Sequence, residues 1–196
     1  MHKLCLLSGF FLVALEAFAP AGGISVGPPS TPTETSYCDV SRDPATYNHK
    51  LIRLTAFITH GFEDFLVGDP TCLTQGFSVW VMYGGKVRSD TMYCCPGEGG
   101  AGSRPEPLEV EGVRTPLVDD AKFRGFTRLP KQAPDTPVRR TAVGTFFSGE
   151  KQSVNGRTMW AGAAHLGCCS LFVIQRVESF DPHTRKDLDY SAEAGW

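Results

Sequence analysis

The chain has 196 residues, a formal net charge of -2, 21 glycines and 14 prolines. General nucleic-acid binding draws on many Lys and Arg contacts with phosphates, so this charge balance argues against nucleic acid as a partner. The length suits a single domain of about 100–200 residues, and the glycines and prolines indicate many turns and little long helix.

Residues 1–21 predict a secretory signal peptide. Lys3 gives a weakly positive start, residues 4–18 are mostly apolar, and Ala19-Pro20-Ala21 supplies a cleavage site. Cleavage after Ala19 is the alternative to cleavage after Ala21. The apolar run is shorter than the roughly 20 residues that a membrane-spanning helix needs. We therefore expect an exported protein, periplasmic or extracellular, with no stable membrane insertion after cleavage.

The segment that follows predicts a flexible tether and then a short helix. Residues 22–36 are rich in Gly, Pro, Ser and Thr, a composition typical of linkers. Asp43 and Pro44 are the residue types that begin helices, as N-cap and first helical position. We expect one or two short helical turns within residues 37–47.

Three strands are predicted next, from alternation of apolar residues. They cover residues 51–59, 65–67 and 77–83, and turn residues separate them. The residues expected to face inward are Ile52, Leu54, Ala56 and Ile58 on the first strand and Phe77, Val79, Val81 and Tyr83 on the third.

Residues 84–137 form a long insertion after the third strand. Within it, residues 117–129 can hold a helix with Leu117, Ala121 and Phe123 facing inward. Long structureless loops are uncommon in compact domains, so we expect the insertion to be functional or partly ordered.

Two more strands are predicted at residues 140–148 and 171–177. The second is almost entirely apolar and β-branched, which suits a strand buried on both faces. Residues 182–196 are a polar tail that we expect to fray. Together the elements predict a mainly β domain over residues 37–181: a small five-stranded OB-like barrel with a short N-terminal helix and a long insertion between strands 3 and 4. An open sandwich is the alternative.

Short motifs in this domain carry a resemblance. They are Cys38-Asp39-Val40 followed by Pro44, Tyr47 and Lys50, then Gly61-Phe62-Glu63-Asp64-Phe65, and finally residues 162–167. The pattern resembles a group of uncharacterised small exported bacterial proteins with an OB-like fold. The resemblance implies a fold and an exported location but no reaction, and adjacent cysteines are not part of the pattern.

Six cysteines follow the signal segment: Cys38, Cys72, Cys94, Cys95, Cys168 and Cys169. In an exported protein they predict three disulfides. Adjacent cysteines would close a strained ring, so we expect one or both of Cys94 and Cys95 to pair with Cys168 and Cys169, and Cys38 with Cys72. Six cysteines allow 15 pairings, so the sequence leaves the connectivity open.

A metal site is the alternative use of these cysteines. His165 precedes Cys168 by three residues, and Cys94, Cys95 and His60 would complete a nitrogen and sulfur set that suits zinc. No C-x-x-C motif is present, which argues against both zinc and thiol redox chemistry. In its Gly-rich bend, His165 more simply hydrogen-bonds the backbone. We therefore expect no cofactor.

The first three strands carry a candidate ligand face. Phe57 and Trp80 are out of phase with the inward residues of their strands, and Arg53 shares a strand face with Phe57. In OB-like barrels this region binds ligands, often by aromatic stacking.

The sequence thus favours a non-enzymatic, exported, disulfide-stabilised binding or interaction module. Its expected partner is an oligosaccharide, a peptide or an envelope protein. No nucleophile elbow, phosphate-binding loop or metalloprotease helix motif is present in the sequence. Two alternatives remain open: a Cys/His metal-binding or thiol-redox protein of the cell envelope, and a purely structural domain of an envelope assembly.

Overall fold

The structure is a computed structural model, and it describes most of the chain after residue 30. The described ranges are residues 31–60, 65–72, 76–89, 102–128, 137–154, 156–164 and 167–180. Within them, no helix has the length and apolar character needed to cross a membrane.

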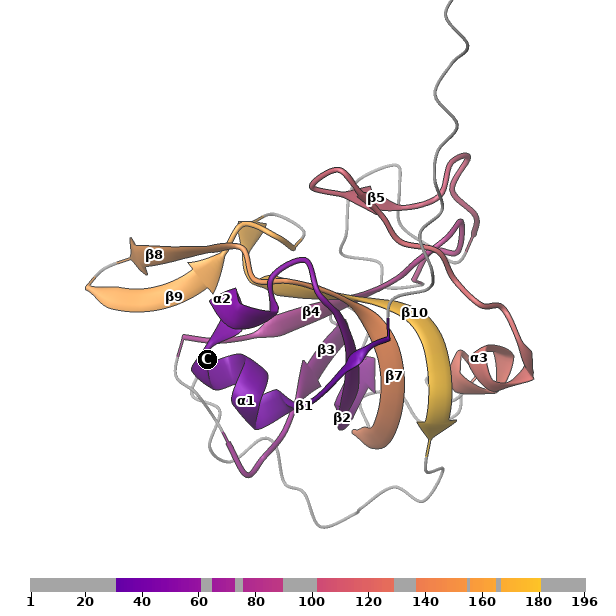
Figure 1. The fold of residues 1–196 in the computed structure, drawn as a ribbon, viewed down its shortest axis with the longest axis horizontal. Helices are drawn as coiled ribbons and strands as arrows, with labels where there is room; N and C mark the ends of the chain where they lie inside the picture. The colour runs from indigo at the N-terminus through magenta and orange to yellow at the C-terminus, as the bar shows by residue number, and fades with distance from the viewer. Residues whose placement is uncertain are drawn as a thin grey trace, which may run out of the picture.

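Five strands form a closed barrel at the centre of the fold (Figure 1). In spatial order they are β2 (Leu51–His60), β3 (Phe65–Gly68), β4 (Val79–Tyr83), β10 (Ser170–Phe180) and β7 (Val138–Phe147). The barrel closes because β2 pairs with both β3 and β7. Strands β4 and β10 run parallel, and the other barrel pairs are antiparallel. The prediction of a mainly β fold with a five-stranded OB-like barrel is therefore confirmed.

The barrel interior follows from the alternation of side chains along each strand. Burial alternates along all of β2, because successive side chains point to opposite sides of a strand. All the residues predicted to face inward from the first and third strands are buried. Strand β10 is buried on both faces, as predicted: Phe172 and Ile174 belong to the interior cluster, and Leu171 and Val173 to a second one.

The second hydrophobic cluster covers the outer side of β4, β10 and β7. Its buried members are Phe147, Ala164, Cys169, Leu171 and Val173, with half-buried Trp80, Met82, Leu108, Val110, Val113 and Ala163 packed against them. The insertion after β4 and the segment between β9 and β10 thus supply a second apolar layer outside the barrel.

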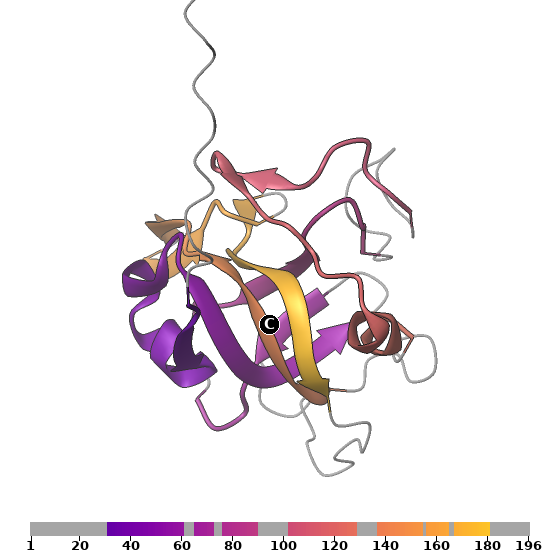
Figure 2. The same ribbon diagram turned by 45° about the vertical axis from the view of Figure 1, so that its right-hand side comes forward.

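The insertion holds a two-stranded hairpin, β5 (Glu109–Val110) and β6 (Val113–Arg114), and the helix α3 (Ala121–Phe126). The helix lies beside β10 (Figure 2). Asp120 caps it by accepting a hydrogen bond from the Phe123 backbone N–H at 2.9 Å. A helix is confirmed within the predicted range but is shorter than that range, so Leu117 lies outside it and packs against the barrel cluster, while Phe123 is buried as expected. The inward assignment of Ala121 is wrong, because in this short helix Phe123 and Phe126, three residues apart, form the buried face.

The N-terminal part is more ordered than the sequence indicates. The predicted short helical turns are confirmed as α1 (Tyr37–Arg42) and α2 (Pro44–Tyr47). The residues just before them form a strand, β1 (Thr33–Ser36), although they fall in the predicted tether. Strand β3 pairs only with the second half of β2, so the first half has an edge that β1 fills in parallel.

A second hairpin, β8 (Glu150–Val154) and β9 (Arg157–Ala161), projects from the barrel on the side away from α3 (Figures 1 and 2). These polar residues lack the apolar alternation that predicts a strand. The hairpin is fixed at its base by a hydrogen bond from the Trp160 N–H to the Gly76 carbonyl, 3.3 Å. It therefore flanks the start of β4.

Candidate ligand face and cysteine pairs

The outer side of β2, β3 and β4 brings the two predicted aromatic residues onto one face. Phe57 lies opposite Gly68, and Leu66 lies opposite Trp80. Residues opposite one another in a ladder share a face of the sheet, so Phe57, Leu66 and Trp80 all face outward. Each is half-buried. We call Phe57, Leu66, Gly68 and Trp80 the outer face.

The two aromatic side chains of the outer face differ in the residues that they pack against. Trp80 packs against the second hydrophobic cluster, at the border between the outer face and that cluster. Among the described residues, Phe57 belongs to neither cluster. Gly68 places no side chain opposite Phe57 on the β3 side, whereas Arg139 lies opposite it on the β7 side.

Arg53 lies on the same side of β2 as Phe57, but its charge is balanced by two carboxylates. Its Nη2 donates to Glu178 Oε1 at 3.1 Å, and its Nε lies 2.7 Å from Glu178 Oε2. It also pairs with Glu34 of β1. Hydrogen bonds to Glu178 and then to Glu34 raise the pKa of Arg53 above its usual value. The guanidinium therefore links β1, β2 and β10.

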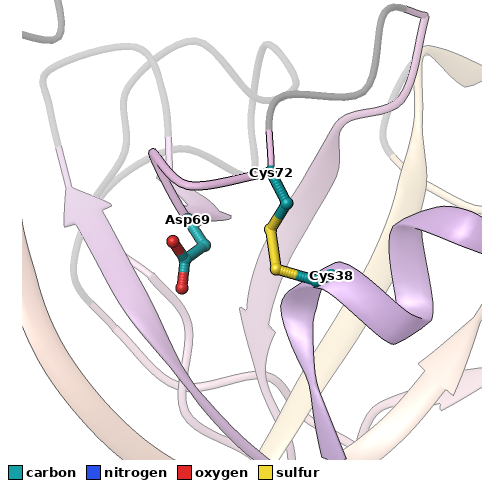
Figure 3. Close-up of side chains that lie close together, drawn as sticks. All are labelled: Cys38, Asp69 and Cys72. Carbon is teal, nitrogen blue, oxygen red and sulfur yellow. A yellow bond between two sulfur atoms is a disulfide. The ribbon is translucent and has the colours of Figure 1, made fainter.

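One predicted disulfide is present. Cys38 of α1 is bonded to Cys72, which follows β3, with a Cα–Cα distance of 5.4 Å (Figure 3). Next to it, the Asp69 carboxylate accepts hydrogen bonds from the Thr71 backbone N–H at 2.9 Å and from the Thr71 hydroxyl at 2.7 Å. The bridge holds α1 against the turn after β3.

The same three side chains form a candidate metal-ligand group. The two sulfurs and a carboxylate oxygen of Asp69 lie within 4.8 Å of one another. Metals bind the thiolate form of cysteine, so the intact disulfide excludes metal binding by Cys38 and Cys72. The group can hold a metal only after the disulfide is reduced.

The second disulfide differs from the prediction. Cys168 and Cys169 are bonded to each other, with a Cα–Cα distance of 3.8 Å, and not to Cys94 or Cys95. The two residues are consecutive and lie just before β10, where the Cys169 carbonyl accepts a hydrogen bond from the Ala164 N–H at 3.0 Å. Cys94 and Cys95 lie outside the described residues.

The predicted zinc set is not assembled within the described part of the chain. Of His165, Cys168 and Cys94, only Cys168 is described, and its sulfur is in the disulfide. His60, a further candidate, is buried at the end of β2 with its ring 4.5 Å from that of Phe65.

The sequence analysis missed Arg140, a buried cation. Arg140 is 3 % exposed, and its guanidinium lies 4.0 Å above the Phe126 ring. Burial lowers its pKa to about 10, and Tyr83 opposes that shift. No hydrogen bond reaches its Nε or Nη1 from the part of the chain that the structure describes. Its burial could have been predicted from the alternation along β7, because Arg140 and Ala142 are two positions apart and therefore face the same side of the strand.

Comparisons with protein-family models, with curated proteins and with solved structures found no match for this chain. The OB-like assignment is therefore established by strand order and pairing. The resemblance to small exported bacterial proteins stays a prediction.

Proposed function

We propose that this chain is an exported, disulfide-stabilised, non-enzymatic binding module that takes an extended ligand on its outer face. The observation that carries the proposal is the placement of Phe57, Leu66 and Trp80 on one side of β2, β3 and β4. In OB-folds the corresponding strands bind oligonucleotides and oligosaccharides. The net charge of -2 disfavours the former.

Two observations support export. Residues 1–21 have the pattern of a signal peptide. The bond between Cys38 and Cys72 is of a kind that persists in oxidising compartments. A periplasmic or extracellular location after signal cleavage follows from this proposal.

The outer face combines apolar side chains with a cation at its edge. Arg53 is already paired with Glu34 and Glu178, so its charge is balanced. Arg139 of β7 lies opposite Phe57 and is exposed, so it places a positive charge beside the face. Aromatic rings bind the apolar sides of sugar rings and peptide side chains. We therefore assign an oligosaccharide, a peptide or an extended segment of an envelope protein as the ligand class.

Chemical-shift mapping tests the proposal. The oxidised protein is titrated with neutral hexasaccharides and with uncharged hexapeptides, and we expect perturbations centred on Phe57, Leu66 and Gly68. Phe57→Ala should weaken binding at least about tenfold, or 1.4 kcal/mol, because hot-spot aromatics carry much of an interface's energy.

Val118→Ala is the matched control, because Val118 is 48 % exposed on the segment before α3 and belongs to another surface. It should leave the affinity unchanged. Perturbations centred elsewhere, or equal binding by Phe57→Ala and the native protein, would refute the assignment.

A second candidate function is metal binding by reduced Cys38, Cys72 and Asp69, whose donor atoms already lie together. Two thiolates and a carboxylate suit zinc. Calorimetry with zinc tests it in reduced protein carrying Cys94→Ser, Cys95→Ser, Cys168→Ser and Cys169→Ser. Asp69→Asn should weaken the binding, and the double variant Cys38→Ser/Cys72→Ser should remove it. An affinity that neither change alters would exclude this site.

A further inference from the structure

The Cys168–Cys169 bridge contributes little to stability, in contrast to Cys38–Cys72. The two bridges join residues separated by 1 and by 34 positions in the sequence. A disulfide stabilises a fold mainly by restricting the unfolded chain, and this effect grows with the length of the loop that it closes. A bond between neighbours closes almost no loop and ties no two elements together. Stabilising the fold therefore does not explain this bridge, and a chemical role is the alternative.

The two residues of this bridge differ in exposure. Cys168 is exposed, whereas Cys169 is 5 % exposed and belongs to the second hydrophobic cluster with Leu171 and Val173. Thiol–disulfide exchange begins when a thiolate attacks one sulfur, and access decides which sulfur that is. An incoming thiolate can therefore reach Cys168, and Cys169 is the leaving group.

The backbone around the bridge is held by hydrogen bonds that do not depend on the sulfur–sulfur bond. The Ala164 N–H donates to the Cys169 carbonyl at 3.0 Å, and the Gly162 N–H donates to the Gly167 carbonyl at 3.0 Å. The Ser170 N–H donates to the Ser78 carbonyl at 3.2 Å, which anchors the start of β10. These hydrogen bonds join backbone groups, so opening the disulfide removes none of their donors or acceptors.

We propose that Cys168–Cys169 is a thiol–disulfide exchange site that oxidises dithiols, with Cys168 as the attacked sulfur. The inference goes beyond the ligand-binding role and does not depend on it. The substrate class is a pair of neighbouring thiols, in a small molecule or in another exported protein.

The exchange balances in two steps. A thiolate of the dithiol attacks Cys168 Sγ, the Cys168–Cys169 bond breaks, and Cys169 leaves as a thiolate that takes up a proton. The second thiol of the substrate then loses its proton and attacks the substrate sulfur of the mixed disulfide, which releases Cys168 as a thiolate that is protonated in turn. The dithiol becomes a disulfide, and two electrons and two protons pass to the cysteine pair. The reverse exchange with another disulfide restores the bridge.

The first test uses the native oxidised protein and dithiothreitol as the probe. Samples are reduced at increasing dithiothreitol, quenched in acid, alkylated and mapped by mass spectrometry. We expect Cys168 and Cys169 to become alkylated together at a concentration at least about tenfold lower than Cys38 and Cys72 require. Reduction of both bridges at the same concentration would overturn the proposal. So would a map of untreated protein that shows Cys168 or Cys169 bonded to any other cysteine.

The second test separates the two sulfurs with matched variants. Cys169→Ser leaves Cys168 as the single thiol of the pair, and Cys168→Ser leaves Cys169, both in a Cys94→Ser/Cys95→Ser background. Glutathione disulfide is the probe, and mass spectrometry follows formation of the mixed disulfide. Because Cys168 is exposed and Cys169 is buried, we expect the reaction at Cys168 to be at least about tenfold faster. Equal rates in two variants with native circular dichroism would contradict the assigned direction of attack.

Discussion

His49 Nε2 and Glu111 Oε2 lie 2.5 Å apart, although the two residues are 62 positions apart in the sequence. His49 lies in the turn just before β2, and Glu111 lies in the turn between β5 and β6. Within the described ranges these are also the two non-glycine residues with positive φ, +58° and +50°. Left-handed backbone is unfavourable for residues with a Cβ, so both turns carry a small energetic cost at the point where the insertion meets the barrel.

This contact predicts how the insertion is held. Glu111→Ala removes the hydrogen bond, which contributes about 0.5–1.5 kcal/mol. We expect amide exchange at Leu108 and Thr115 to become about 2–10 times faster, while the barrel strands keep their protection. Hydrogen exchange followed by NMR measures this.

Glu109→Ala is the control, because among the residues that the structure describes the Glu109 carboxylate pairs only with Arg114 of the same hairpin, at 3.5 Å. An equal acceleration in the two variants would mean that the hairpin is loosened from within and that His49 does not hold it.

Gly144 marks a close approach of two strands in the barrel wall. A Cβ at this position would lie 2.2 Å from the Val173 carbonyl oxygen and 2.8 Å from the Phe172 ring. Gly144→Ala must therefore separate β7 from β10, and overpacking of this kind costs about 1–3 kcal/mol. Urea denaturation measures the loss. Gly102→Ala is the matched control, since a Cβ at Gly102 meets nothing within 4 Å. Similar stabilities for the two variants would disprove the close approach.

The two disulfides should differ in their effect on stability. Cys38→Ser/Cys72→Ser should lower the free energy of unfolding by about 2–4 kcal/mol, because a bridge across 34 positions restricts a long loop of the unfolded chain. Cys168→Ser/Cys169→Ser should change it by less than about 1 kcal/mol, since that bridge joins neighbours. Guanidinium denaturation of both double variants gives the comparison. A larger loss for the second pair would reverse our view of which bridge is structural.

Arg140 should destabilise the fold at neutral pH. Its charge is buried, and a buried cation without full hydrogen bonding is often less stable than an apolar residue of similar volume. The contact with Phe126 offsets part of this cost. We expect Arg140→Met to raise the free energy of unfolding by about 1–3 kcal/mol at pH 7.

The pH dependence gives a separate check on Arg140. Its pKa in the folded protein is about 10, below the ordinary value of 12.5, so above pH 10 the unfolded state binds more protons at this residue than the folded state. Stability from this residue alone therefore rises with pH in that window, and the cost of burial is fully present below it. The advantage of Arg140→Met should shrink as the pH is raised beyond 10. A variant that is less stable at pH 7, with a constant difference up to pH 11, would show that Arg140 is well paired.

Strand patterns predicted the barrel because alternation is a local property with a fixed period. Phe77, Val79, Val81 and Tyr83 are in phase, and all four are buried as that phase requires. The same phase placed Phe57 and Trp80 outside, as the strand pairing now shows. The pattern could not tell that Trp80 would pack against the second hydrophobic cluster, since that cluster joins segments distant in the chain.

The sequence alone determined the mainly β character, the inward and outward residues of the long strands and the short helix after Asp43. These features depend on local periodicity and on helix-starting residues. The bridge between Cys38 and Cys72 was expected from the sequence but not fixed by it, because six cysteines allow 15 pairings. Only the tertiary structure decided the pairing of β1 with β2, the projecting hairpin β8–β9, the Cys168–Cys169 bond and the burial of Arg140 beneath α3. Each of these features depends either on which distant segments the closed barrel brings together or on how a loop is folded. The alternation of residues along a single strand contains no information about these two things.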